Sequence, residues 1–343
     1  MRALPVGFTG SGEGLRRHAR RDLLINIVLG GLYTSVARRR AAEYLTRCTI
    51  IDDTPIVHAS LAHSRWPAIL LAAAFVALRV ASEFGWGPPL PLLIAGGVLL
   101  LPWLWATVVA RTVGALRWRE LQLAFDASWR DVYLASWPLL VLGGAWAIAQ
   151  PQVAALASAP DSLDARWLPV AAAAGAVAFP LLARVAFNFQ RLRFTGTRVG
   201  GAQVSWAAGF PAYLRLWLLT AAGVLATAVA PVLLLRRALL GSISLEDLPV
   251  TEAVLVYCVA LILVWVLSAP ARAWYEARHF ILTWNGLRVA DTAKVECALD
   301  ARAFVRMRTA DAWRTFATFG FHAPQAAVRA YRAKLASLTV WSA

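Results

Sequence analysis

Six long apolar stretches constrain the fold of this chain more than any other feature of its sequence. Each is about twenty residues long, the length that an α-helix needs to cross a hydrocarbon core of roughly 30 Å. The stretches are residues 66–84, 90–110, 132–150, 167–187, 213–235 and 250–268. With 59% hydrophobic and 15% charged residues, the chain lies outside the composition of soluble domains. The sequence therefore predicts an integral membrane protein.

A basic, hairpin-like segment recurs between these stretches. In residues 179–206 an apolar helix runs into Arg191 and Arg193, and two short β-like runs then flank residues 198–201, Arg-Val-Gly-Gly. Related segments occur at 103–128 and 266–299, and in weaker form at 33–60. Their first arginines are Arg38, Arg111, Arg184 and Arg272, at spacings of 73, 73 and 88 residues. Such a spacing is typical of an internally repeated architecture with two apolar stretches per period.

We therefore predict an all-α polytopic membrane protein with internal parallel repeats of helix pairs and six full transmembrane helices. The helix pairs are 66–110, 132–187 and 213–268. The small β-hairpins between them leave one apolar face, as the alternation in 121–125 and 199–206 indicates. Because a lone hairpin is marginal in water, we expect these hairpins to pair into a small cytoplasmic β-assembly.

This scheme divides the chain into five parts. They are an N-terminal segment with the first hairpin (1–65), three repeats of helix pair plus hairpin (66–131, 132–212 and 213–309) and a C-terminal segment (310–343). The two end segments contain apolar stretches of about half a span, 23–36 and 312–323, a length typical of re-entrant or interfacial elements. We favour two shallow elements that enter from the cytoplasm, with a pair of full spans as the alternative.

The distribution of basic residues orients the chain in the membrane. The hairpin segments 37–65, 111–131, 184–215 and 270–334 hold 25 Lys plus Arg, whereas the connections 84–89, 151–166 and 236–249 hold 3. The positive-inside rule places all four hairpin segments in the cytoplasm. The same rule accounts for the net charge of +15, so we predict no nucleic-acid partner.

The sequence carries no recognised catalytic or metal-binding motif. It lacks H-E-x-x-H, the phosphate-binding G-x-x-x-x-G-K-[ST] and the G-x-S-x-G nucleophile elbow. Its five histidines share no convincing metal-ligand spacing, and three distant cysteines indicate no disulfide framework. We therefore predict no enzyme activity, no catalytic residues, no metal and no cofactor.

Two sets of charged residues are candidates for function. Arg79 and Glu83 form an intramembrane pair one helical turn apart, which could line a polar cavity for an anionic solute. The alternative is that Arg79 extends toward the headgroups of the outer leaflet. Arg111, Arg184 and Arg272 lie at the inner ends of the repeated helices and are candidate contacts to anionic lipids of the cytoplasmic leaflet, with ordinary headgroup anchoring as the alternative.

Two flanking segments resemble a known family. Residues 28–45, VLGGLYTSVARRRAAEYL, and 318–335, TFGFHAPQAAVRAYRAKL, resemble the paired T-L-G-[ILF]-[YF]-x-P-W-A-x-x-R-x-x-R-Y motif of the YjgN-like family of uncharacterised bacterial inner-membrane proteins. Thr34-Ser35-Val36 replaces the P-W-A step, and Gln325 stands where Trp is usual. The resemblance implies an inner-membrane location and a helix-plus-hairpin plan. It also implies a membrane zinc peptidase as a candidate partner.

These observations lead to two hypotheses of function. The first is a non-enzymatic partner or scaffold in an inner-membrane complex, with the lipid bilayer and anionic lipids as further contacts. The alternative is a transporter or channel for a small anionic solute or lipid, which the repeats, the Pro-containing helices and Arg79 favour. A stoichiometric partner would distinguish the first from the second.

Overall fold

The computed structural model describes residues 2–28, 33–58, 89–157, 167–241, 249–290 and 292–342. The chain divides into two compact units. Unit 1 comprises residues 1–56, 207–287 and 291–343, and unit 2 comprises residues 57–206 and 288–290.

Unit 1 contains two modules of the same strand–helix–helix–strand plan, one at each end of the chain. The N-terminal module consists of β1 (Arg2–Phe8), α1 (Gly12–Val28), α2 (Thr34–Arg47) and β2 (Thr49–Ile51). The C-terminal module consists of β10 (Ala293–Cys297), α12 (Ala301–Ala317), α13 (Ala323–Ala336) and β11 (Leu338–Ser342). In both modules the first helix has 17 residues and the second has 14. The two modules therefore have equivalent helical hairpins.

The local chemistry of the two modules also corresponds. Ser11 accepts a hydrogen bond from the backbone N–H of Gly14 (3.1 Å), and Asp300 accepts from those of Arg302 (2.8 Å) and Ala303 (3.2 Å). These side chains satisfy N–H groups that the first turn of a helix leaves without partners. A single residue, Cys48 in one module and Ser337 in the other, separates the second helix from its strand.

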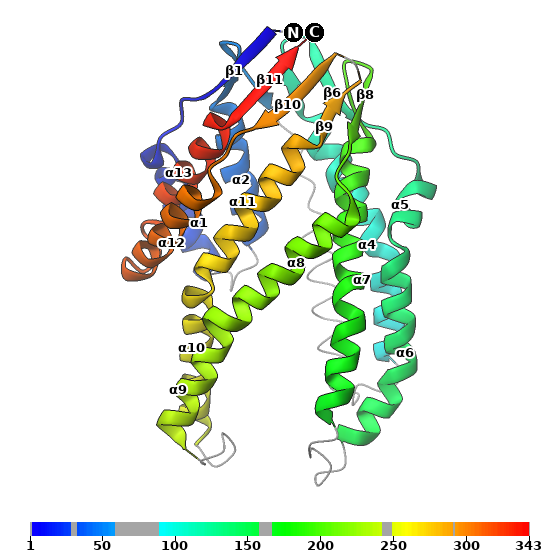
Figure 1. The fold of residues 1–343 in the computed structure, drawn as a ribbon, viewed down its shortest axis with the longest axis vertical. Helices are drawn as coiled ribbons and strands as arrows, with labels where there is room; N and C mark the ends of the chain where they lie inside the picture. Colours follow the sequence, from blue (N-terminus) through cyan, green and yellow to red (C-terminus); the bar gives the residue numbers. More distant parts are fainter. Residues whose placement is uncertain are drawn as a thin grey trace. The chain divides into compact units, whose positions relative to one another are not determined.

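The strands of unit 1 form an antiparallel sheet in the order β3-β2-β1-β11-β10, where β3 is Thr54–Pro55. A two-residue turn joins β2 to β3, and Asp52 and Asp53 both adopt positive φ (47° and 58°), as a type I′ hairpin turn requires. Strands β1 and β11 pair from Arg2 opposite Ser342 to Pro5 opposite Thr339. This pairing brings the two chain ends together (Figure 1).

The middle of the chain adds long helices to unit 1. Helix α8 (Phe210–Val224) continues through a π-helical turn (Leu225–Val229) into α9 (Ala230–Leu240), and α10 (Val250–Leu267) is followed by α11 (Ala269–Asn285). Strand β9 (Leu287–Val289) starts one residue after α11. Helix α11 packs against α8 and α12, and α13 packs against α1. Ala277, Phe304 and Ala330 bury a small core where α11, α12 and α13 meet.

Unit 2 combines a second antiparallel sheet with apolar helices. Its elements are β4 (Val57–His58), α4 (Pro89–Gly114), β5 (Leu116–Trp118), β6 (Leu121–Phe125), α5 (Trp129–Ala135), α6 (Trp137–Ala157), α7 (Trp167–Thr195), β7 (Thr197–Val199) and β8 (Ala202–Trp206). The strands lie in the order β4-β5-β6-β7-β8. Trp105 of α4 stacks on Phe189 of α7 with ring centroids 4.5 Å apart, so aromatic packing joins the two helices.

The predicted all-α class with six transmembrane helices is wrong. The described residues hold eleven strands in one extended antiparallel order, so strands form a major part of the fold. Three helices, Ala95–Gly114, Ala172–Thr195 and Phe210–Leu235, are long and apolar enough to cross a membrane, and Val254–Leu267 with Ala269–Asn285 adds a fourth if that bent pair counts as one span. These helices indicate membrane association. The predicted span 66–84 lies outside the described residues.

The same sequence pattern interrupts the predicted span 132–150 and ends the predicted span 250–268. Helix α5 ends before Ser136 and helix α10 ends before Ser268, and in each case a proline (Pro138 or Pro270) follows two residues later. Proline lacks the N–H that would bond the carbonyl four residues before it. Each serine hydroxyl donates to the carbonyl oxygen three residues before the serine, Tyr133 (2.8 Å) or Trp265 (3.1 Å). The second break bends the chain by 44°. Hydropathy alone does not detect such breaks.

The two short flanking stretches belong to helical hairpins. Residues 312–323 include the end of α12, a turn and the start of α13, and these two helices pack against each other. Phe319 and Gly320 adopt positive φ (49° and 90°) in that turn. Residues 23–36 include the end of α1 and the start of α2, and positions 29–32 are outside the described residues. Neither stretch is among the candidate spans of the described chain.

The helix–strand junction at Gly196 gives a test of this packing. A Cβ atom at Gly196 would lie 2.9 Å from the carbonyl oxygen of Leu192, from Cβ of Ala127 and from Cε2 of Phe125. We expect Gly196→Ala to destabilise the protein by about 1–3 kcal/mol, because overpacking forces the neighbours apart. Gly114→Ala is the control, since nothing lies within 4 Å of its added Cβ. Thermal unfolding in detergent compares the two, and equal melting temperatures would contradict the packing.

Candidate functional site

A cavity of 280 Å³ lies inside unit 1, between the α10–α11 bend and the helices α12 and α13. Its charged lining residues are Arg272 and Glu276 of α11 with Arg308 and Asp311 of α12. Trp265 and several alanines form most of the remaining wall. A cavity that combines small apolar side chains with a few converging charges is the usual form of a ligand site.

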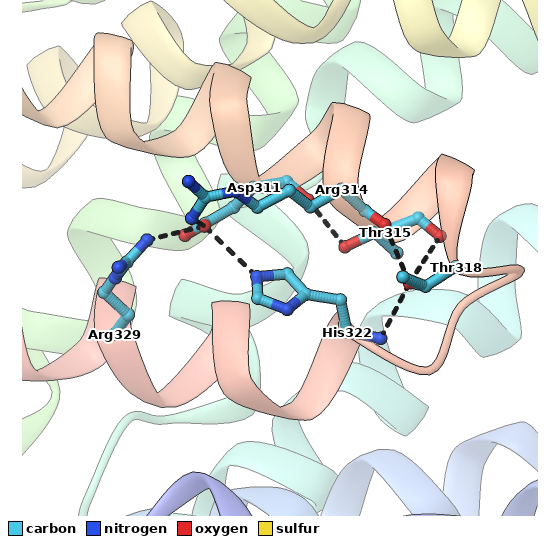
Figure 2. A network of polar contacts seen from close by, with 6 residues as sticks. All are labelled: Asp311, Arg314, Thr315, Thr318, His322 and Arg329. Carbon is cyan, nitrogen blue, oxygen red and sulfur yellow. Dashed lines mark hydrogen bonds and ion pairs between the residues drawn. The ribbon is translucent and has the colours of Figure 1, made fainter.

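Asp311 is the most buried charged group at this cavity, with 0% of its surface exposed. Its Oδ1 atom lies 2.9 Å from Nη1 of Arg329, 3.3 Å from Nε2 of His322 and 3.9 Å from Nη1 of Arg314. Figure 2 shows that Arg329 and His322 both point toward this carboxylate, which α12 carries. A buried carboxylate is strongly destabilising unless it is paired, and these side chains supply the pairing for Asp311.

The second oxygen of the same carboxylate, Oδ2, differs from Oδ1 in its hydrogen bonding. Oδ2 of Asp311 is buried and has no hydrogen-bond partner within the part of the chain that the structure describes. A buried acceptor without a donor costs about 1–3 kcal/mol. Because Asp311 lines the cavity, this acceptor is a candidate contact for a bound molecule.

Glu276 is paired at both of its oxygens. Oε1 accepts a hydrogen bond from Nζ of Lys334 (2.7 Å), and Oε2 accepts from Nε of Arg308 (3.0 Å). Among the described residues, no hydrogen bond occupies the two terminal amino groups of Arg308. Glu276 thus fixes the orientation of Arg308 and leaves the end of its guanidinium available at the cavity.

Arg272 caps the bend between α10 and α11. Its Nη2 atom donates to the carbonyl oxygen of Trp265 (2.5 Å), and its Nε atom donates to the hydroxyl of Ser268 (3.1 Å). The guanidinium also lies over the Trp265 ring, 5.0 Å from the centroid. These contacts satisfy a carbonyl group that the break in the helix exposes, so Arg272 is held rigidly at the cavity wall.

The N-terminal module repeats the buried ion pair. Nη1 of Arg40 lies 2.8 Å from Oδ1 of Asp22, which is 4% exposed. The two pairs have the same sequence separation of 18 residues. Tyr33 occupies the position that corresponds to His322, and its ring lies 5.6 Å below the guanidinium of Arg40. Asp22 does not line the cavity, so the pair itself is a structural element of both modules.

The structure describes only some of the residues that the sequence selected. Arg79 and Glu83 lie outside the described residues. Arg111 is exposed in the last turn of α4, and Arg184 of α7 lies 5.6 Å from the Phe187 ring and lines a cavity of 300 Å³ in unit 2. Arg272 is the candidate that belongs to the cavity of unit 1.

Asp311 and Asp22 were not selected from the sequence. A usable signal existed, because each aspartate precedes an arginine of a motif copy by 18 residues. Extending the comparison of 28–45 with 318–335 toward the N-terminus would have revealed both aspartates.

No group of three or more His, Cys, Asp or Glu side chains that could hold a metal ion occurs in the described ranges.

A further cavity of 380 Å³, between α8 and α11, is lined by Arg215 and Arg278 among apolar side chains. Burial raises the pKa of Tyr331, whose hydroxyl lies 3.1 Å from that of Thr49, so this phenol stays neutral and joins α13 to β2.

The chain belongs to a family of bacterial proteins of unknown function, DUF898, whose model matches residues 3–343. No match was found among curated proteins or among solved structures.

The Asp311 cluster leads to a stability prediction. Arg329→Gln removes the nearest countercharge of a fully buried carboxylate, and we expect a loss of about 2–4 kcal/mol in the free energy of unfolding. Arg314→Gln is the control, because its guanidinium lies 3.9 Å from Oδ1, beyond hydrogen-bond distance, whereas that of Arg329 lies 2.9 Å away and the two side chains are similarly exposed; a weak ion pair of this kind contributes about 0–1 kcal/mol. Thermal unfolding in detergent measures both. A loss for Arg314→Gln as large as for Arg329→Gln would contradict the assignment.

Proposed function

We propose that this protein is a non-enzymatic membrane protein of the bacterial inner membrane whose unit 1 cavity binds the anionic headgroup of a phospholipid. The observation that carries the proposal is the cavity itself, where the end of the Arg308 guanidinium and the clamped Arg272 face a pocket walled by Trp265 and alanines. Arginine is the side chain best suited to bind phosphate oxygens in a partly desolvated site.

The position of the cavity along the chain supports a headgroup. The last apolar turn of Val254–Leu267 ends at the cavity wall, and Trp265 is the kind of residue that lies at the membrane interface. Beside the cavity, the turn between α12 and α13 exposes Phe319 (93%) and Phe321 (61%). Exposed aromatic side chains of this kind favour insertion at the headgroup level of a bilayer.

The charge of the site supports an anion. The cavity and the ion pairs that reach it contain more cations than carboxylates, namely Arg272, Arg308, Arg314, Arg329 and Lys334 against Glu276 and Asp311. A phosphate group would offset part of this excess. The excess therefore favours anionic over zwitterionic lipids.

A lipid-dependence experiment tests the proposal. We expect anionic phospholipids to raise the melting temperature of the purified protein in detergent, and Arg308→Gln to remove most of this increase. Arg306→Gln is the matched control, because Arg306 lies on the same helix α12 and does not line the cavity. An equal reduction in both variants would indicate unspecific electrostatic binding and would overturn the cavity as the site.

A second candidate function is a partner or scaffold in a membrane complex. The candidate span windows are only 22%, 11% and 6% buried within the protein, the last for Phe210–Leu235. Helices with so little cover contact either lipid or another membrane protein, and the apolar helix α10 likewise exposes Tyr257 (61%). The transport alternative, which the repeats, the Pro-containing helices and Arg79 favour, stays a prediction, and Arg79 is outside the described residues.

Affinity purification of the native membrane complex, followed by mass spectrometry, tests the second candidate. We expect a stoichiometric membrane partner, and a zinc peptidase is the partner that the family resemblance implies. A variant with paired charges on α10, Leu255→Glu with Val259→Glu, places carboxylates on the exposed face and should release the partner. Recovery of the protein alone from the wild-type membrane would contradict this candidate.

A further inference from the structure

The unpartnered oxygen of Asp311 defines what the bound molecule must offer. Oδ2 is buried in a residue that lines the cavity, and as a carboxylate oxygen it can only accept a hydrogen bond, whereas Oδ1 holds the ionic contacts. The other acceptors nearby are engaged. Both oxygens of Glu276 are paired, and the hydroxyl of Thr315 donates to the backbone carbonyl of Asp311 (2.7 Å). The ligand therefore needs a donor for this one atom.

The charges around Asp311 decide which type of donor fits. An ammonium group at Oδ2 would enter a region that already contains Arg329 and Arg314 beside Asp311, with Arg308 and Arg272 in the lining of the same cavity. Repulsion between like charges in a partly desolvated site disfavours that arrangement. A neutral hydroxyl satisfies the same acceptor without adding positive charge.

We infer that the cavity recognises a phosphodiester whose headgroup carries a free hydroxyl, with the phosphate bound by Arg308 and Arg272 and the hydroxyl donating to Oδ2 of Asp311. This inference rests on the proposed lipid-binding function and names its ligand class. A glycerol-type headgroup has this chemistry. An ethanolamine headgroup has the ammonium that the surrounding arginines disfavour.

Three vesicle or mixed-micelle additions compare the ligand classes on the full-length protein. Phosphatidylglycerol carries the hydroxyls, phosphatidylmethanol has the same phosphodiester charge without a hydroxyl, and phosphatidylethanolamine carries an ammonium. Native mass spectrometry with competing lipids measures their relative occupancy. We expect the wild type to prefer phosphatidylglycerol over phosphatidylmethanol by about tenfold, the effect of one hydrogen bond to a charged group.

The two modules provide a matched pair of variants. Asp311→Leu removes the acceptor while an apolar side chain fills the buried position, and we expect its preference for phosphatidylglycerol over phosphatidylmethanol to disappear. Asp22→Leu removes the equivalent buried ion pair away from the cavity and should retain the preference. If Asp311→Leu does not fold, Asp311→Asn keeps the shape, loses the charge and should reduce the preference severalfold.

The outcomes separate this inference from the proposed function. Equal binding of phosphatidylglycerol and phosphatidylmethanol, both sensitive to Arg308→Gln, would overturn the hydroxyl contact and leave the anion site in place. Insensitivity of all lipids to Arg308→Gln would overturn the site itself. Soluble glycerophosphoglycerol tests whether the acyl chains of the lipid contribute to binding. If it binds as strongly as phosphatidylglycerol, the headgroup chemistry is supported and a lipid as the natural ligand is overturned.

Discussion

The antiparallel pairing of β1 with β11 is the constraint on which unit 1 depends. Each of these strands has a neighbour from its own module on one side, so their mutual pairing satisfies the backbone groups that would otherwise form two open edges. The pairing makes the first and last modules neighbours, and α1 packs on α13 as a result. The opposite side of the C-terminal hairpin is then left for α11, and the cavity forms where α11 meets α12 and α13.

The two modules contain the same buried Asp–Arg pair, but only one of these pairs lies at the candidate binding site. Asp22 and Asp311 are both buried, and each holds an arginine of the second helix at the same sequence separation. Removal of one partner from such a pair is costly, which explains why each module keeps both charges. Only Asp311 lies beside α11, where the wall contains Arg308 and Arg272. The difference between a structural pair and a candidate binding site is therefore the neighbouring helix.

The sequence allowed part of this structure to be predicted, and the reasons for the failures are physical. Apolar length identified the helices at 90–110, 167–187 and 213–235, because hydropathy over twenty residues depends on little else. It could not reveal the breaks at Ser136 and Ser268, which depend on where a freed carbonyl finds a new donor. Strand pairing between residues 2–5 and 339–342 spans nearly the whole chain, and alternation within a strand does not identify its neighbour. Arg272 was identified as a basic group, whereas its role at the bend required its contacts.

The break that ends the apolar helix of residues 250–267 also creates the candidate site. A continuous helix would bond the carbonyl of Trp265 within its own backbone and leave Arg272 free to extend into solvent. At the bend, the carbonyl of Trp265 instead accepts a hydrogen bond from the guanidinium of Arg272, and the chain turns by 44°. Trp265 and Arg272 thus belong to the bend and to the cavity wall at once. The cavity is consequently fixed to the end of an apolar helix, as the proposed headgroup site requires.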